Sequence, residues 1–334
     1  LAAYDKARTF MSAALGGQPE EVGENDFDPK ELSLEVTYLR ARPFHWAWIL
    51  YLASFLLTAL NRFKLIRFLS LLAFAGGFAV QTYGFYLRSV IAGRPPVSNM
   101  YESLIWVSWT VSLFALIYFW VNRSVYLRNT AALVSFMTLI LAQQFPAFFS
   151  PSISPLVPVL RSNLWLTLHV LTVTMSYGAF ALAWGLGHGL VFSFVCRGAQ
   201  AGEHQKKLSA YLYRTLQVGV VLLAAGTVLG GIWANYSWGR YWGWDPKETW
   251  ALIALLGYLA VLHGAYANWY GDFGIAVGAV IAFLGVVMAW YGVNYVLGAG
   301  LHSYGFGAGG AGYVGAAALL DVGWILWMAA RIRK

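Results

Sequence analysis

The sequence contains a single cysteine, Cys196, among its 334 residues. One thiol cannot form an internal disulfide, a cysteine-rich zinc site or an iron–sulfur cluster. Cys196 stands at the end of an apolar run, directly before Arg197. We expect it to have no functional role, and redox chemistry that needs a cysteine pair within this chain is excluded.

Charged residues are also scarce, at 11% of the chain against about 25% in soluble globular proteins. Several apolar runs exceed the roughly 18 residues that cross a bilayer as a helix. The sequence therefore predicts an all-α polytopic membrane protein with about nine transmembrane helices. The predicted spans are residues 44–60, 68–92, 100–121, 128–146, 164–196, 214–234, 249–268, 273–296 and 312–330.

The net charge of +8 does not indicate a nucleic-acid partner, because the basic residues cluster in short segments between apolar runs. Twelve Lys and Arg residues fall in one alternate set of connections and five in the other. The positive-inside rule places the richer set in the cytoplasm. The N-terminal segment and residues 93–99, 147–163, 235–248 and 297–311 are then predicted to face outward.

Residues 1–43 are polar and acidic, begin with Leu rather than Met, and contain no signal peptide. An outward-facing segment without a signal sequence needs an upstream membrane segment to deliver it. We therefore expect residues 1–43 to be an extracytoplasmic segment of a processed or larger protein. Residues 44–334 are expected to form the membrane domain.

Common catalytic motifs are missing as well. The Gly run at 305–312 holds no GxGxxG that follows a strand, and the chain has no P-loop. No Ser–His–Asp or paired-carboxylate arrangement can be assembled from the sequence. We therefore expect no catalytic nucleophile.

Aromatic residues, in contrast, are concentrated at 235–250, NYSWGRYWGWDPKETW. Tryptophan favours membrane interfaces, and an aromatic belt explains one or two Trp residues at a helix end. A belt does not explain a run that is punctuated by Gly and contains an acid. Indole faces offer broad, rigid stacking area. The aromatic residues of this segment are Tyr236, Trp238, Tyr241, Trp242, Trp244 and Trp250.

The remaining residues of the segment also suit a ligand. Gly239 and Gly243 leave backbone room beside the large rings. Arg240 and Lys247 are suited to anionic groups such as carboxylates. Together with the indole rings, they predict a platform for a large planar dianion at the membrane surface.

Asp245 has a structural role available in addition. It precedes Pro246, and Glu248 follows in the first turn, which is the pattern of a helix N-cap with Pro at the first helical position. Asp245 is therefore predicted to begin a helix, whether or not it also contacts the ligand.

The string WGRYWGWD at 238–245 matches the WGxxWxWD pattern of the tryptophan-rich, or WWD, haem-handling family, and DPKETWAL extends the match. RPPVSNMYES at 94–103 is similar to the segment that the CcsA/ResC branch carries after an early span. Residues 44–334 thus resemble the CcsA/ResC-type subunit, or the C-terminal half of a fused CcsBA-type protein, of the System II cytochrome c synthase. Residues 1–43 lack this match and resemble the tail of a ResB/CcsB-like region.

Two of the six histidines are predicted to lie on the same side of the membrane as residues 235–250. His169 lies near the outer end of the fifth span, and His302 lies in the Gly-rich loop GAGLHSYGFGAGG. Neutral imidazoles ligate haem iron, and two complete its coordination, although position alone also fits ordinary interfacial histidines. The resemblance favours ligation, because the family has one external histidine before and one after the WWD segment.

The other four histidines receive separate interpretations. His263 lies in the inner half of the seventh span, where the resemblance implies an intramembrane haem ligand whose opposite ligand comes from a partner; a histidine bonded to a neighbouring helix is the alternative. His188, at similar depth, is a second candidate ligand within the chain. His45 lies at the outer mouth of the first span, and His204 is expected to be a solvated cytoplasmic residue.

The resemblance implies a holocytochrome c synthase (haem lyase) component of a bacterial inner membrane or a thylakoid-type membrane. It would act with a ResB/CcsB-like partner and bind haem b at an external site and at an intramembrane site. The external site would present haem to the CxxCH motif of apocytochrome c. The implied haem-presenting residues are His169, His302, Trp238, Trp242, Trp244 and Asp245. The implied haem contacts are Trp238, Gly239, Arg240, Tyr241, Trp242, Gly243, Trp244, Asp245, Lys247 and Trp250.

Two other functions remain open at this point. A membrane haem exporter or carrier of the CcmC type would share the tryptophan-rich segment and leave ligation to a partner. A cytochrome b-like electron-transfer subunit would need pairs of histidines on facing spans at matched depths, which only His188 and His263 approximate.

Overall fold

The computed structural model describes residues 29–60, 63–122, 124–146, 148–153, 164–197, 202–302 and 310–332. Predictions for residues 1–28, and for residues 147, 154–163 and 303–309 of the two outer loops, lie outside the described residues. The chain divides into two compact units, Leu1–Ala41 and Arg42–Lys334. In the first unit the helix α2 covers Pro29–Ala41, and all other described elements belong to the second unit.

The described residues contain helices and no β-strand, which confirms the predicted all-α fold. Eight of these helices are long and apolar enough to cross a membrane, with α10 and η3 counted together, so the chain is a multi-pass membrane protein. The helices of the second unit are α3 (Pro43–Ala59), α4 (Lys64–Ala92), α5 (Met100–Asn122), α6 (Val125–Gln144), α7 (Leu164–Arg197), α8 (Glu203–Trp238), α9 (Pro246–Tyr266), α10 (Asp272–Val287), η3 (Met288–Leu297) and α11 (Ala311–Ile332).

The first predicted span, 44–60, is the exception. It forms the helix α3, whose 17 residues fall just short of the roughly 18 that cross a bilayer as a helix. α3 nevertheless packs on α4 and α6. Its Tyr51 is fully buried and donates a hydrogen bond of 2.8 Å to Gln81 Oε1 of α4. α3 is therefore an integral part of the bundle.

α8 is longer than its apolar run. It begins at Glu203, whereas the run predicted a start at 214, because hydropathy detects only the lipid-compatible part of a helix. The polar first turns contain neither Gly nor Pro, and Gln205, Leu208 and Leu212 are buried along one face. Their spacing of three and four residues is typical of an amphipathic helix.

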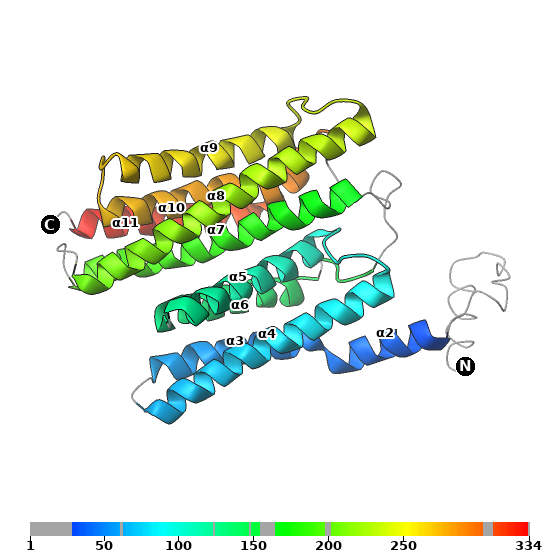
Figure 1. Ribbon diagram of the computed structural model, residues 1–334, viewed down its shortest axis with the longest axis horizontal. Helices are drawn as coiled ribbons and strands as arrows, with labels where there is room; N and C mark the ends of the chain where they lie inside the picture. The colour runs from blue at the N-terminus through cyan, green and yellow to red at the C-terminus, as the bar shows by residue number, and fades with distance from the viewer. Residues whose placement is uncertain are drawn as a thin grey trace. The chain divides into compact units, whose positions relative to one another are not determined.

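The helices of this unit form two groups, α3–α6 and α7–α11, which meet where α5 and α6 pack on α7 (Figure 1). The two groups approach closely at Gly178 of α7, where a Cβ would collide with Thr110 of α5; small residues at helix contacts are typical of membrane bundles. Within the second group, the Phe180 ring of α7 stacks on Tyr258 of α9, with centroids 3.8 Å apart. Through these contacts α7 joins its own group, α7–α11, to the other group.

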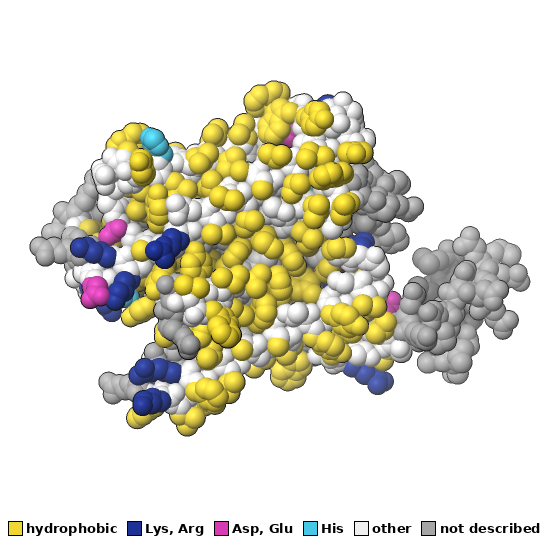
Figure 2. Space-filling view, viewed as in Figure 1, with side chains coloured by type: hydrophobic (Ala, Val, Ile, Leu, Met, Phe, Trp, Pro, Cys, Tyr) yellow, Lys and Arg dark blue, Asp and Glu magenta, His cyan; other side chains and the backbone are white. Residues whose placement is uncertain are grey.

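Hydrophobic side chains cover much of the face that Figure 2 shows. Exposed apolar side chains include Val121, Leu319 and Leu320, each about three-quarters exposed at 75%, 76% and 75%. Extended apolar surface of this kind marks a membrane-contacting protein. We call the end of the bundle that carries residues 235–250 the tryptophan-rich end; α8 ends there and α9 begins there.

Candidate functional site

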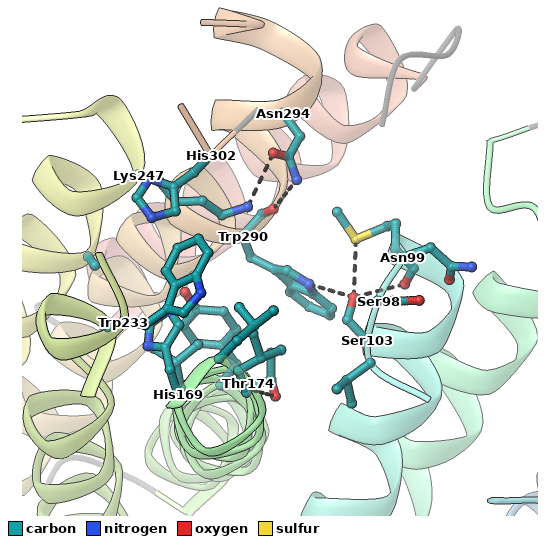
Figure 3. Close-up of a pocket in the computed structure, with 18 of the residues that line it drawn as sticks. Ser98, Asn99, Ser103, His169, Thr174, Trp233, Lys247, Trp290, Asn294 and His302 are labelled. Carbon is teal, nitrogen blue, oxygen red and sulfur yellow. Dashed lines mark hydrogen bonds between the residues drawn. The ribbon is translucent and has the colours of Figure 1, made fainter. Parts of the chain in front are cut away.

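A cavity of about 640 Å³ lies at the tryptophan-rich end, between the two helix groups. Its volume falls within the ~300–1,000 Å³ typical of ligand pockets. One wall comes from α7, α8, the segment after α8 and the start of α9, and the opposite wall from residues 94–103 and 148–152. η3 and His302 complete the lining (Figure 3).

His169 of α7 lines this cavity, and a neighbouring helix orients its ring. Its Nδ1 donates a 2.7 Å hydrogen bond to the carbonyl oxygen of Gly226 on α8. A carbonyl only accepts, so Nδ1 carries the hydrogen and Nε2 keeps a free lone pair. A Cβ at Gly230 would collide with the imidazole, so glycine is needed there for the ring to lie against α8.

His302 also lines the cavity, and a carboxylate orients its ring. Its Nδ1 lies 3.0 Å from Oδ1 of Asp245. Because a carboxylate accepts hydrogen bonds, the neutral imidazole again keeps its lone pair on Nε2. The Trp238 ring packs edge-on against the imidazole, with centroids 4.7 Å apart. Both cavity histidines therefore have an anchored Nδ1 and an Nε2 left for a ligand.

Asp245 combines this role with the helix cap that the sequence predicted. Its side chain accepts from the backbone N–H of Lys247 at 3.0 Å and of Leu301 at 2.6 Å. Burial alone would raise the pKa of the Asp245 carboxyl, but the hydrogen bonds from His302 and from these two N–H groups outweigh burial and lower the pKa to about 2. Asp245 is thus ionised at neutral pH, beside His302.

Glu248 completes the capping box of α9. Its carboxylate accepts from the backbone N–H of Gly243 at 2.7 Å and of Asp245 at 3.2 Å, and it lies 3.0 Å from Arg240. Trp244, between these residues, has a φ of 57°, a conformation unusual for a bulky residue. The carboxylate of Glu248 therefore holds the tryptophan-rich segment in a tight, folded form.

Five residues predicted to bind haem line the cavity: His169, Tyr241, Trp242, Lys247 and His302. Trp238 contacts His302, and Asp245 acts through it. The other predicted contacts shape the segment or lie outside the lining, and Trp244 is 69% exposed. The predicted residues outside the lining are Trp238, Gly239, Arg240, Gly243, Trp244, Asp245 and Trp250.

Trp233, which the sequence analysis did not single out, lies beside both cavity histidines. Its buried ring lies 6.4 Å from that of His169, nearly parallel at 6°, and 5.6 Å from that of His302. A signal was present, since Trp233 precedes Trp238 in the last turns of α8, after the paired glycines Gly230 and Gly231. The hydropathy of that stretch indicates only a span.

Residues 94–103 of the opposite wall were recognised from the sequence as a family signature, but the sequence assigned them no role. Behind it, Arg88 of α4 and Glu102 of α5 form a fully buried ion pair at 2.9 Å. Arg88 also donates to the carbonyl oxygens of Pro151 and Ser152, at 2.9 and 3.2 Å. Glu102 accepts from the backbone N–H of Ser98 at 2.8 Å. One ion pair thus holds both segments of this wall.

η3 supplies the third side of the cavity. It is a π-helix, a form often found at functional sites. Trp290 donates from Nε1 to Ser103 Oγ at 2.9 Å, which links η3 to α5, and Asn294 Oδ1 accepts from Lys247 Nζ at 3.2 Å. Neither Trp290 nor Asn294 was predicted, because an apolar run gives no sign of a change in helix type.

The remaining histidines lie away from the cavity lining. His263 is exposed in the last turn of α9, and its ring lies 5.4 Å from that of Trp269. Nε2 of His188 on α7 lies 2.9 Å from Asp321 Oδ1 on α11. His45 packs edge-on against Trp48. The structure thus gives His188 and His263 different neighbours.

His204 differs from its predicted environment. We expected a solvated residue, but its ring is half-buried and lies 4.5 Å from that of Tyr126. The contact joins the start of α8 to the start of α6, at the end of the bundle away from residues 235–250. The free Cys196 is exposed, near the end of α7.

Comparisons with known proteins agree with this architecture. Residues 97–302 match the family described as cytochrome c assembly protein. The chain is 39% identical to Protein NrfI of Wolinella succinogenes over 234 residues, which are 69% of this chain and 25% of NrfI. It is 34% identical to the cytochrome c biogenesis protein CcsA of Prochlorococcus marinus strain MIT 9303 over 263 residues (68% of this chain and 81% of CcsA), and 36% identical to CcsA of Guillardia theta over 254 residues (66% and 79%).

The fold is also found among solved structures. The cytochrome c heme lyase CcmF superposes with a TM-score of 0.56 at 17% identity, covering 88% of this chain and 51% of CcmF. The chain thus spans about half of CcmF and a quarter of NrfI, but most of the CcsA proteins. The family match covers the whole cavity lining except Arg94 and Pro95, and it includes the tryptophan-rich segment and His302. The chain therefore belongs to the cytochrome c assembly protein family, as a CcsA-type member that serves cytochrome c biogenesis.

Proposed function

We propose that the chain holds haem in the cavity at the tryptophan-rich end and presents it for covalent attachment to apocytochrome c. The observation that carries this proposal is the matched geometry of His169 and His302. Both line one cavity, both bind an acceptor through Nδ1, and both leave Nε2 free. Metal-binding histidines typically make such a second hydrogen bond, and two imidazoles complete the axial coordination of haem iron.

The surroundings of the two imidazoles suit a porphyrin. Trp233 lies beside both rings, and Tyr241 and Trp242 add aromatic surface. Aromatic faces provide rigid contact area for a planar ligand. The cavity also has polar groups on the opposite wall, including Ser98 and Ser103. In this proposal the substrate is haem b. The chain contacts the haem on one side, and apocytochrome c approaches it from another.

The chemistry needs no nucleophile from this chain. Each thiol of the CxxCH motif adds across one haem vinyl group: a sulfur–carbon bond forms, the thiol hydrogen moves to the other vinyl carbon, and the C=C double bond becomes single. No electrons are gained or lost overall. The chain supplies binding and orientation. The CxxCH histidine then displaces one of the two axial imidazoles, which releases the product.

The proposal includes a direction across the membrane and a partner. We place the tryptophan-rich end outside the cytoplasm, because twelve Lys and Arg residues fall in the opposite set of connections and five in the connections on this side, not counting the five of the N-terminal segment. Haem reaches an inner site at His263 before it moves to the cavity. His263 is exposed, so its opposite ligand comes from a ResB/CcsB-like subunit or fused half.

Co-production in cells tests the proposal. The chain, its ResB-like partner and an apocytochrome c should together give haem bound covalently, detected by haem staining after denaturing electrophoresis. His169→Ala and His302→Ala should each abolish this product and the external haem spectrum. His204→Ala is the matched control, because His204 lies away from the cavity.

The outcomes separate the candidate functions. A chain that binds haem through His169 and His302 but never yields covalent cytochrome with its partner would be a carrier of the CcmC type. Unchanged haem content and spectra in both alanine variants would remove these histidines as ligands and refute the proposal.

A further inference from the structure

The cavity wall contains one lysine whose charge is not matched by an acid. Lys247 stands in the first turn of α9, half-buried, and its ammonium donates to Asn294 Oδ1 at 3.2 Å. Among the described residues, no carboxylate oxygen lies within 4.0 Å of that nitrogen. Its hydrogen-bond partner is neutral, and the Asp245 carboxylate acts on it only from beyond 4.0 Å. An ammonium inside a cavity without a paired acid is a site for an anionic group.

The other cations that the structure describes in this region are already paired. Arg94, also in the cavity lining, lies 3.4 Å from Glu102. Arg240 lies 3.0 Å from Glu248, and its guanidinium stacks 5.7 Å over the Trp238 ring. The sequence treated Arg240 and Lys247 as equivalent anion-binding candidates. The structure distinguishes them, since Arg240 stabilises the tryptophan-rich segment while Lys247 faces the cavity.

Asn294 determines where the ammonium points. In Figure 3 the ammonium of Lys247 points toward the side chain of Asn294, and Trp290 lies on the same helix as Asn294. The Asn294 amide lies one turn after Trp290, and its Nδ2 donates to the Trp290 carbonyl oxygen at 3.4 Å. Trp290 is in turn tied to Ser103 at 2.9 Å. η3 thus supplies an oriented acceptor that holds the lysine in the cavity lining.

We propose that Lys247, positioned by Asn294, binds a carboxylate of the ligand in the cavity. The inference rests on the proposed function, in which that ligand is haem with its two propionate carboxylates. The propionates and vinyl groups of haem stand on opposite edges of the macrocycle. A propionate held at Lys247 therefore fixes the rotation of the porphyrin about its iron and turns the reactive vinyl edge away from α9.

A double comparison of protein and ligand tests this assignment. The probes are haem and haem dimethyl ester, in which both carboxylates are esterified, titrated by their Soret absorbance into the full chain in nanodiscs. All variants carry His263→Ala, so that the titration reports on the cavity. The key variant is Lys247→Met, which preserves the cap of α9, because the hydrogen bond to Asp245 comes from the backbone N–H of Lys247.

The unmodified cavity should bind haem about tenfold or more tightly than the ester, the effect expected for one charge-assisted hydrogen bond. Lys247→Met should bind haem and ester equally, and Lys247→Arg should retain part of the preference. Asn294→Leu should weaken the preference without abolishing it, since it removes only the positioning acceptor. Lys207→Met, at an exposed lysine of α8 paired with Glu203, is the matched control and should behave as the unmodified cavity.

Each result has a definite meaning. If Lys247→Met keeps the full preference for haem over its ester, or the unmodified cavity shows no preference, the assignment of Lys247 is wrong while haem binding stands. If the unmodified cavity binds neither compound, the proposed function fails together with the assignment.

Discussion

The two cavity histidines have partners of different charge. His169 donates to the neutral carbonyl of Gly226, whereas His302 donates to the carboxylate of Asp245. A carboxylate that accepts a hydrogen bond from Nδ1 of an imidazole raises the basicity of Nε2, the nitrogen that would bind the metal. In the proposed haem complex, His302 is therefore the stronger donor of the pair, and Asp245 influences the iron through His302 although it does not line the cavity.

Replacing Asp245 with Asn isolates this influence. Asn also caps helices well, so α9 should still begin at the same place, but the charge beside His302 is lost. We expect external haem to bind about 10- to 100-fold more weakly and its reduction potential to rise. Haem titration and redox titration measure these effects. Asp321→Asn, at the other His–Asp contact, is the control and should leave both values unchanged; equal effects at the two positions would contradict the role of Asp245.

The pH dependence of this variant follows from the carboxyl pKa. Contacts that lower the pKa of Asp245 to about 2 stabilise the fold above the ordinary pKa of 3.8, and that stability is lost as pH falls through about 2. Between about pH 5 and about pH 8 the wild-type carboxylate is therefore always ionised. The deficit of Asp245→Asn should accordingly be constant over this range, and a deficit that disappears at the acidic end would show that another group controls it.

At the scale of elements, the buried pair between α4 and α5 determines the wall at residues 94–103. Arg88 and Glu102 are both fully buried, and Arg88 also binds two carbonyl oxygens of the 148–153 loop. Removing Arg88 leaves the buried Glu102 carboxylate with Arg94, 3.4 Å away, as its charged partner. The loss of one member of a buried pair costs about 3–5 kcal/mol. Replacing both members with apolar residues is often much less damaging.

Arg88→Ala should therefore lower the thermal unfolding temperature of the purified chain substantially and weaken haem binding, because the wall loses its support. The double variant Arg88→Met, Glu102→Met should recover much of the stability. Unfolding followed by tryptophan fluorescence measures both effects. Lys207→Met removes an exposed ion pair and should have little effect; a similarly small effect of Arg88→Ala would contradict the proposed support.

These elements also show what the sequence could and could not predict. Apolar runs locate α4 to α11 because lipid contact requires them, and the tryptophan-rich motif identifies one cavity wall. Hydropathy does not report that α8 begins at Glu203 or that the last turns of the eighth predicted span form the π-helix η3. Trp290 and Asn294, which line the cavity, both lie in that π-helical segment. Arg88 and Glu102 meet through tertiary packing, which pattern alone does not encode.

At the scale of the whole chain, α9 connects the two proposed haem sites. Asp245 caps one end of α9, and His263 lies in its last turn. At 1.5 Å per residue, the intervening residues separate the two sites by roughly 27 Å along the helix axis. The lining of the cavity at the tryptophan-rich end comes from this chain. His263, in contrast, is exposed and has Trp269 as its aromatic neighbour. Haem must therefore cross most of the bilayer between the two sites.

His263→Ala tests whether haem passes through these sites in sequence. In cells that contain the ResB-like partner, this variant should lose haem from the inner site and, because the route is interrupted, from the cavity as well. Haem per purified protein, measured as the pyridine haemochrome, should fall below that of the His204→Ala control. Haem added to the purified variant should refill the cavity, since His169 and His302 remain oriented by Gly226 and Asp245. Full cavity loading in cells would instead show that haem reaches the tryptophan-rich end without His263.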